Sequence, residues 1–255
     1  MSRPVICLYL VGETSDEIRA RHGSYTDWFG RLFARHDVDV RPVDGYRAAD
    51  LGPPIDPGAY DGIVITGSPS SLAAPEPWME RAVALVRAAY EQKTPLFGVC
   101  FGHQLIGAAL GGQVVRNPRG WQISTLDIEL NDAGRDDPLF DGLPARFAVN
   151  LSHQDIICER TLAKDSVVEV LAGNAKSAVQ AVAAGPRMRG VQFHPEFSGP
   201  VIGAYIESRR DLLSDDASRR QAPHEMPDPL LALVRDSPAG EQVMHNFVDH
   251  FVVRR

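Results

Sequence analysis

The sequence predicts an α/β fold with a mostly parallel central sheet and helices on both faces. In the first half of the chain, short apolar runs of strand length alternate with longer segments of helical periodicity. This alternation is typical of a parallel sheet covered by helices. The middle of the chain instead holds several short strand-like runs separated by turns. We expect these runs to form a small extra strand region that extends or flanks the sheet.

The elements can be placed in order from periodicity and from turn residues. Strands of the first half are expected at residues 5–11, 38–43, 62–66 and 95–99. Helices of the first half are expected at residues 16–35, 77–92 and 101–110. Later strands are expected at residues 124–130, 146–150, 167–171, 178–182 and 189–193. The chain should then form a helix at residues 200–213, a polar surface segment at 214–229 and a closing helix at 240–252.

Length and composition favour a single globular domain over residues 1–255. The 255 residues contain no internal repeat and no linker, and the hydrophobic fraction of 44% and charged fraction of 23% are average. Intrinsic disorder, collagen and coiled coil are therefore excluded as classes. The net charge of −7 argues against a nucleic-acid partner, since such proteins carry a basic patch.

The cysteines and the first apolar run bear on the cellular compartment. Three scattered cysteines without a CxxC pair predict free thiols in a reducing compartment and argue against a zinc site. The apolar run at residues 4–11 is far shorter than the roughly 20 residues of a membrane span. We expect a buried first strand, no membrane partner and a cytoplasmic protein.

The sharpest motif is Gly98-Val99-Cys100-Phe101-Gly102, at the expected junction of a strand and a helix. It matches the G-x-S-x-G nucleophile elbow with cysteine in place of serine. A sharp strand-to-helix turn exposes the middle side chain at a helix N-terminus, where partial positive charge favours a thiolate. The backbone N–H of Phe101 would point to the same space and could hold an oxyanion.

A second motif is His194-Pro195-Glu196. In an extended segment, residues two apart point to the same side, so the imidazole and the carboxylate can act together. A carboxylate that orients an imidazole facing a thiol is the general arrangement of nucleophile, base and orienting acid. A weaker signal is Gly67, which follows the end of an expected strand. Glycine lets the backbone approach a ligand closely, so the Gly67 N–H could be a second oxyanion donor.

Together these pieces resemble the class I, triad-type glutamine amidotransferase family. The chain is most similar to stand-alone proteins related to the amidotransferase half of GMP synthase, and also resembles the γ-glutamyl peptidases of this superfamily. The matching segments are Gly67-Ser68-Pro69, residues 98–104, Gly111-Gly112, Ser152-His153-Gln154-Asp155, His194-Pro195-Glu196 and Asn246-Phe247. The resemblance implies a flavodoxin-like three-layer fold.

The resemblance also implies the roles of individual residues. Cys100 would be the nucleophile, His194 the base and Glu196 the orienting acid. The backbone N–H groups of Gly67 and Phe101 would form the oxyanion hole. The family's reaction needs no metal or organic cofactor.

Substrate-binding roles follow from the same resemblance. Gln104 would hold the glutamyl backbone, and Ser152, His153 and Gln154 would line the substrate pocket. A pocket-wall histidine without direct contact is the alternative for His153. The substrate would be glutamine or another γ-glutamyl compound.

The leaving group separates two candidate functions. If it is ammonia, the protein is a glutaminase or amidotransferase, and this interpretation is placed first because of the motifs. If it is an amino acid or peptide, the protein is a γ-glutamyl peptide hydrolase. The chain has no G-x-x-x-x-G-K loop, so an ammonia acceptor would be a separate synthetase subunit. A non-catalytic binding protein is a third class, disfavoured by the intact motifs, and an α/β-hydrolase is disfavoured because its acid precedes its histidine.

Residues 199–239 form a C-terminal elaboration relative to compact synthetase-linked domains of the family. The interpretation that we favour is a surface elaboration without a catalytic role. Covering the active site, docking a partner and making a homodimer contact are the alternatives.

Overall fold

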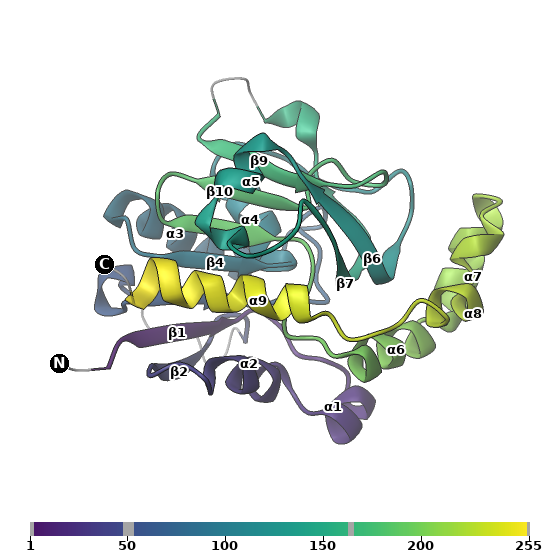
Figure 1. Cartoon of the computed structure of the whole chain (residues 1–255), viewed down its shortest axis with the longest axis horizontal. Helices are drawn as coiled ribbons and strands as arrows, with labels where there is room; N and C mark the ends of the chain where they lie inside the picture. The colour runs from purple at the N-terminus through teal and green to yellow at the C-terminus, as the bar shows by residue number, and fades with distance from the viewer. Residues whose placement is uncertain (1–2, 48–53, 163–165, 254–255) are drawn as a thin grey trace.

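The computed structural model describes residues 3–47, 54–162 and 166–253. Within these residues, a nine-stranded sheet forms the centre of the molecule (Figure 1). Its parallel half has the order β2 (Asp39–Asp44), β1 (Val5–Leu10), β3 (Gly62–Ile65), β4 (Leu96–Val99) and β11 (Met188–Val191). The antiparallel half continues from β11 with β10 (Ala181–Ala184), β9 (Val168–Gly173), β6 (Gln122–Leu130) and β7 (Arg146–His153). A separate antiparallel pair joins β5 (Val114–Arg116) to β8 (Asp155–Ile157).

Helices cover both faces of the sheet, which confirms the predicted α/β fold. One face packs against α2 (Tyr25–Phe33), α6 (Gly199–Ser208) and α9 (Pro238–Phe247), and the other against α3 (Pro77–Gln92) and α4 (Phe101–Ala109). Alternation along β1 divides its side chains between the two apolar clusters, Ile6 and Leu8 on one side, Cys7 and Tyr9 on the other. Burial raises the pKa of the Cys7 thiol to about 12, as expected for a packing residue.

The N-terminal helical region is split, whereas the sequence predicted one helix at residues 16–35. The first helix, α1 (Asp16–His22), ends at Gly23, whose φ of 87° is in the left-handed region. Ser24 and Asp27 then form a capping box that starts α2. A helix-ending glycine at Gly23 and a helix-starting cap at Ser24 therefore divide the region into two helices. The spacing of apolar residues alone had predicted one continuous helix.

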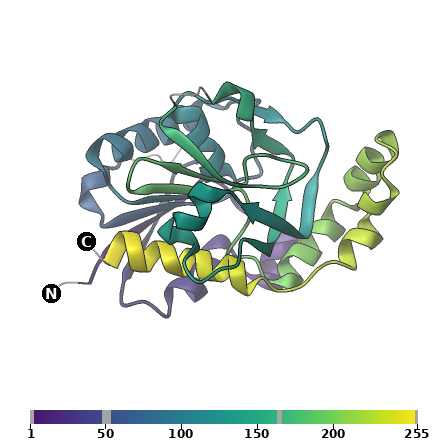
Figure 2. The same cartoon turned by 45° about the horizontal axis from the view of Figure 1, so that its top comes forward.

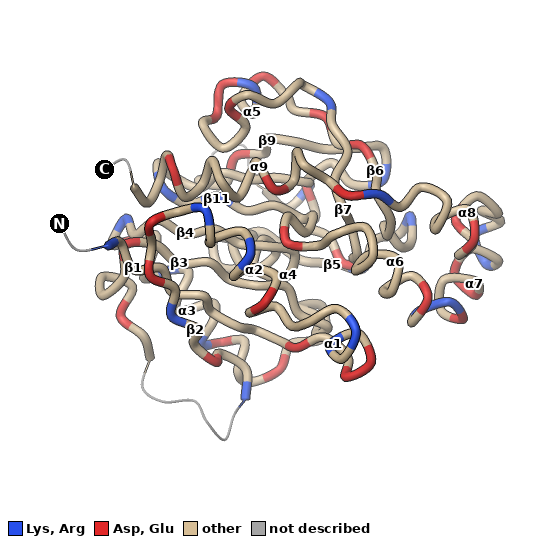
Figure 3. The backbone as a smooth tube through the Cα atoms, turned by 60° about the horizontal axis from the view of Figure 1, so that its bottom comes forward, with Lys and Arg blue, Asp and Glu red and all other residues tan. Residues whose placement is uncertain are grey.

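The C-terminal elaboration is helical, and helices occupy most of the polar surface segment expected at 214–229. Helix α7 (Arg210–Arg219) occupies its first part, and α8 (Pro227–Leu231) its last part. In Figures 1 and 2 these two helices project away from the sheet. Acidic and basic residues are interspersed along α7 (Figure 3), and pairs such as Arg220 with Asp216 at 2.6 Å support a helix with few apolar contacts.

The closing helix is present but differs in its bounds. It starts at Pro238, with Ser237 as a cap, and continues beyond α9 as a π-helical turn at Val248–Val253. The strands predicted at 178–182 and 189–193 lie at Ala181–Ala184 and Met188–Val191. None of the helices in the described ranges combines the length and apolar character of a membrane span.

The close packing of β4 against α4 generates a stability prediction. A Cβ added at Gly98 would lie 2.4 Å from backbone atoms of Gly102, so Gly98→Ala is expected to lower the free energy of unfolding by about 1–3 kcal/mol. Gly30 lies inside α2 with open space around it, so Gly30→Ala is expected to raise it by about 0.5–1 kcal/mol. Urea denaturation of both variants measures this difference. Equal stabilities would contradict the assigned role of Gly98.

Candidate active site

The candidate site lies where the adjacent parallel strands β4 and β11 end, the usual ligand position in an open α/β sheet. Cys100 follows β4 directly and precedes the first residue of α4. Its backbone has φ 53° and ψ −97°, a strained conformation for a non-glycine residue. Its N–H donates to the carbonyl of Val191 at 2.8 Å, which ties the turn to β11. The predicted sharp strand-to-helix elbow is therefore present at Cys100.

Glycines permit this turn, as the sequence spacing suggested. A Cβ at Gly102 would lie 2.6 Å from the carbonyl oxygen of Ile65 on β3. Together with the Gly98 contact, this close approach seats the first turn of α4 directly on the sheet. The thiol is thereby held at the N-terminus of α4, where the helix favours negative charge.

His194 and Glu196 lie beside Cys100, but not in the extended segment that the sequence predicted. Strand β11 ends at Val191, and His194-Pro195-Glu196 forms a turn in which the Phe197 N–H donates to the His194 carbonyl at 3.3 Å. The turn brings His194 Nδ1 to 2.7 Å from Glu196 Oε1. Both side chains are buried. The pairing of imidazole and carboxylate is thus present through a different backbone path.

The charges of this group favour a protonated imidazole. Burial lowers the pKa of His194, but the charges of Glu196 and Cys100 and hydrogen bonds to both oppose it and raise the pKa to about 10. His194 thus lies between Glu196, which it contacts through Nδ1, and Cys100, which lines the same pocket. This is the geometry that a base needs between a nucleophile and an orienting acid.

Aromatic rings fix the plane of the His194 imidazole. Phe197 stacks on it with a centroid distance of 3.9 Å and an interplanar angle of 5°. Tyr205 of α6 stacks on the other side of Phe197 at 4.9 Å, and its hydroxyl donates to Thr14 at 2.8 Å. Residues 199–239 were favoured as a surface elaboration, yet their first helix packs against the ring that holds His194.

The two predicted oxyanion donors lie near the thiol. Phe101 is the first residue of α4 and adjoins Cys100 in the chain. Gly67 lies close to both His194 and Cys100. A Cβ added to it would lie 2.9 Å from His194 Cε1 and 3.7 Å from Cys100 Cβ. The Thr66 hydroxyl beside it accepts from the Val11 N–H at 3.2 Å, which anchors this loop to the end of β1.

A buried amide network, which the sequence analysis missed, lies behind the thiol. Gln192 Nε2 approaches Cys100 Sγ at 3.6 Å, and its Oε1 accepts from Gln104 Nε2 at 3.1 Å. Gln104 also donates to the backbone carbonyl of Asp155 at 2.9 Å. The sequence offered one indication of this role. Gln192 lies two residues before His194 and directly follows β11, so it could have been expected near the site.

The neighbouring histidines are buried and neutral. Burial lowers the pKa of His153 to about 3 and that of His103 to about 4. His153 Nδ1 lies 3.0 Å from the carbonyl oxygen of Asp155. His103 packs against Gly190 of β11. Neither ring is therefore suited to carry a proton at neutral pH.

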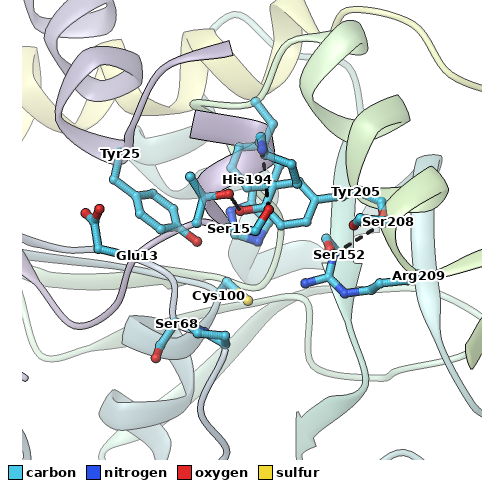
Figure 4. Close-up of a pocket in the computed structure, with 14 residues that line it drawn as sticks. Glu13, Ser15, Tyr25, Ser68, Cys100, Ser152, His194, Tyr205, Ser208 and Arg209 are labelled. Atoms are coloured by element: carbon cyan, nitrogen blue, oxygen red, sulfur yellow. Dashed lines mark hydrogen bonds between the residues drawn. The ribbon is translucent and has the colours of Figure 1, made fainter. Parts of the chain in front are cut away.

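Two pockets meet at Cys100 (Figure 4 shows the larger one). The larger has a volume of about 390 Å³ and includes Glu13, Tyr25 and His194 in its wall. The smaller, of about 120 Å³, brings together the predicted substrate-binding residues. These are Gln104, Ser152, His153 and Gln154. The residues that border both pockets are Ser68, Pro69, Cys100, Ser152 and Arg209.

Comparison with known proteins places this architecture in a family. The family model for class-I glutamine amidotransferases matches residues 24–209. The chain belongs to this family. It is 32% identical to a γ-glutamyl-L-1-hydroxyisopropylamide hydrolase from a Pseudomonas species, over 88% of this chain and 76% of that protein.

Two further comparisons agree with the assignment. The chain is 28% identical to γ-glutamyl peptidase 5 of Arabidopsis thaliana, over 87% of this chain and 88% of the relative. A glutamine amidotransferase structure from Methylobacillus flagellatus superposes with a TM-score of 0.73 at 18% identity, covering 98% of this chain and 95% of that one. This structural likeness establishes the fold.

The charge on His194 generates a prediction about pH. Glu196→Gln removes a carboxylate that raises the pKa of His194, so we expect the pKa to fall toward its ordinary range. NMR titration of the imidazole protons measures it. Because the folded pKa is raised, the pair stabilises the fold fully below pH about 6.5, and this contribution is lost as the pH rises through about 10.

The matched control is Glu207→Gln. Glu207 is exposed on α6 and pairs with Arg210 at 2.9 Å, so its replacement should leave the His194 titration unchanged. An unaltered titration in Glu196→Gln would contradict the electrostatic coupling.

Proposed function

We propose that this protein hydrolyses γ-glutamyl amides through a γ-glutamyl thioester on Cys100. The observation that carries the proposal is the buried His194–Glu196 pair, joined at 2.7 Å, in the pocket that Cys100 also lines. The strained elbow and the helix N-terminus add to the reactivity of the thiol. The family and the γ-glutamyl hydrolases and peptidases among its relatives support the same chemistry.

Acylation would begin with attack of the Cys100 thiolate on the γ-carbonyl carbon, forming an S–C bond. The resulting oxyanion accepts hydrogen bonds from the N–H groups of Phe101 and Gly67, each worth about 10²–10³ in rate. Collapse of the tetrahedral intermediate breaks the C–N bond. The His194 imidazolium gives its proton to the departing amine, while Glu196 holds the ring in position.

Deacylation would use the same residues in reverse roles. His194, now neutral, takes a proton from water as the oxygen attacks the thioester carbon. The S–C bond then breaks and glutamate leaves. Thiolate and imidazolium are restored. In this scheme Gln104 and the Ser152–Gln154 strand end bind the glutamyl part, and the Gln192 amide positions the sulfur.

Glutamine is the smallest substrate that fits this chemistry, and γ-glutamyl peptides are larger substrates of the same class. If ammonia is the product, a separate synthetase subunit would be its acceptor. The 390 Å³ pocket beside His194 favours larger amines, as do the relatives named for γ-glutamyl amide and peptide cleavage.

Loss of the nucleophile tests the proposal. Cys100→Ala is expected to abolish γ-glutamyl hydrolysis while the fold is retained, because no thioester can form. Cys158→Ala is the matched control, since this partly exposed thiol lies at the end of β8, outside both pockets. Amine release and circular dichroism of each variant measure activity and fold. Full activity in Cys100→Ala would refute the mechanism.

A turnover screen with the isolated chain separates the two candidates. We expect cleavage of γ-glutamyl dipeptides to exceed ammonia release from glutamine, because only the dipeptides fill the larger pocket. The rates are compared as kcat/KM at neutral pH. Weak turnover of glutamine that rises sharply with a co-purifying synthetase would instead assign the amidotransferase function.

A further inference from the structure

The larger pocket lies on the side of Cys100 from which the amine departs. His194 lines this pocket, whereas Phe101 and Gln104 line the smaller one. The group that protonates the leaving nitrogen must face the departing amine. If the proposed function holds, the smaller pocket takes the glutamyl part, and the larger pocket takes the leaving group. A volume of about 390 Å³ far exceeds the space of one ammonia, which is close to the roughly 30 Å³ of a water molecule.

Arg209 borders both pockets and reaches the larger one without a carboxylate partner among the described residues. It follows the last residue of α6, and its guanidinium lies over the rings of Tyr205 at 4.6 Å and Trp121 at 5.6 Å. Within the described residues the guanidinium makes a single hydrogen bond, to the Tyr205 carbonyl, which is long at 3.5 Å. The adjacent Arg210 instead pairs with Glu207 at 2.9 Å and Asp228 at 2.7 Å.

This guanidinium is half-buried, and a ligand carboxylate can supply the charged partner that it lacks. Desolvation lowers the pKa of Arg209 below its ordinary value, yet an arginine remains charged at neutral pH. Figure 4 shows its side chain directed toward Cys100 from the side of Ser152, with Glu13 on the opposite side of the sulfur. Stacked rings hold the planar fork in place, which suits bidentate binding of a carboxylate.

The remaining charges near the site are already matched. Glu13 pairs with Arg19 at 3.0 Å. The smaller pocket has its own charged pair, Arg116 and Asp155 at 3.4 Å. This pair can receive the carboxylate and ammonium groups of the glutamyl α-carbon. Arg209 is therefore the cation left for the other part of the substrate.

We propose that Arg209 is a specificity-determining residue that binds the carboxylate of an α-amino acid leaving group. The preferred substrates are then γ-glutamyl amino acids and not simple γ-glutamyl amides. In such a substrate the carboxylate is attached to the carbon next to the departing nitrogen. The guanidinium would hold that carboxylate while His194 protonates the nitrogen.

Two substrates that differ only in this carboxylate test the proposal. γ-Glutamylalanine and γ-glutamylethylamide share the acyl part and the carbon skeleton of the amine. The wild type is expected to favour γ-glutamylalanine in kcat/KM by about 10- to 100-fold, the range of one charge-assisted contact. Arg209→Met is expected to bring this ratio close to one, and Arg209→Lys to restore part of it.

The matched control is Arg210→Met, which removes a neighbouring arginine that is paired on the surface. It should keep the wild-type ratio. An equal loss on both substrates in Arg209→Met, or a wild-type ratio of one, would overturn the assignment of Arg209. If Arg209→Met does not fold, Arg209→Gln takes its place as the neutral variant, and a wild-type ratio in folded Arg209→Gln would overturn the assignment. Failure of the wild type to cleave either substrate would instead overturn the proposed function.

Discussion

The close approach of β4 and α4 at Gly98 and Gly102 is the constraint on which the site depends. Only hydrogen atoms fit between these backbones, because a Cβ added at Gly98 would lie 2.4 Å from backbone atoms of Gly102. This contact forces the chain at Cys100 into a positive φ and points the thiol out of the sheet. The parallel pairing of β4 with β11 then brings the segment that carries His194 to the same edge. The nucleophile and the base therefore meet as a consequence of strand order.

The base depends on a second interaction, the aromatic stack from His194 through Phe197 to Tyr205. This stack connects the edge of the sheet to α6, which belongs to the C-terminal elaboration. A face-to-face stack restricts rotation of the imidazole about its bond to the backbone. The Glu196 carboxylate restricts it at Nδ1. Two restraints on one ring leave its other nitrogen free to face the thiol.

The sequence was sufficient for the parallel first half of the sheet, the elbow and the pairing of His194 with Glu196, because each follows from local spacing. It was insufficient where geometry depends on distant segments. Apolar periodicity does not register the cap at Ser24 that splits the first helical region. The turn at His194 follows from pairing of β11 with two neighbours, which sets where the strand ends. Gln192 gains its role through Gln104, a residue 88 positions away.

Substrate choice is encoded outside the motifs that identify the family. In the proposed mechanism, the acyl half of the reaction needs Cys100, His194 and the oxyanion donors, and these are the same for ammonia or for a larger amine. The space that an amine enters is bounded by α1 and α6, through residues such as Ser15 and Tyr205. Small changes in these two helices can alter the leaving group without touching the acylation machinery. On the proposed assignment, the half-buried guanidinium of Arg209 says more about the leaving group than Cys100, His194 and Glu196 do.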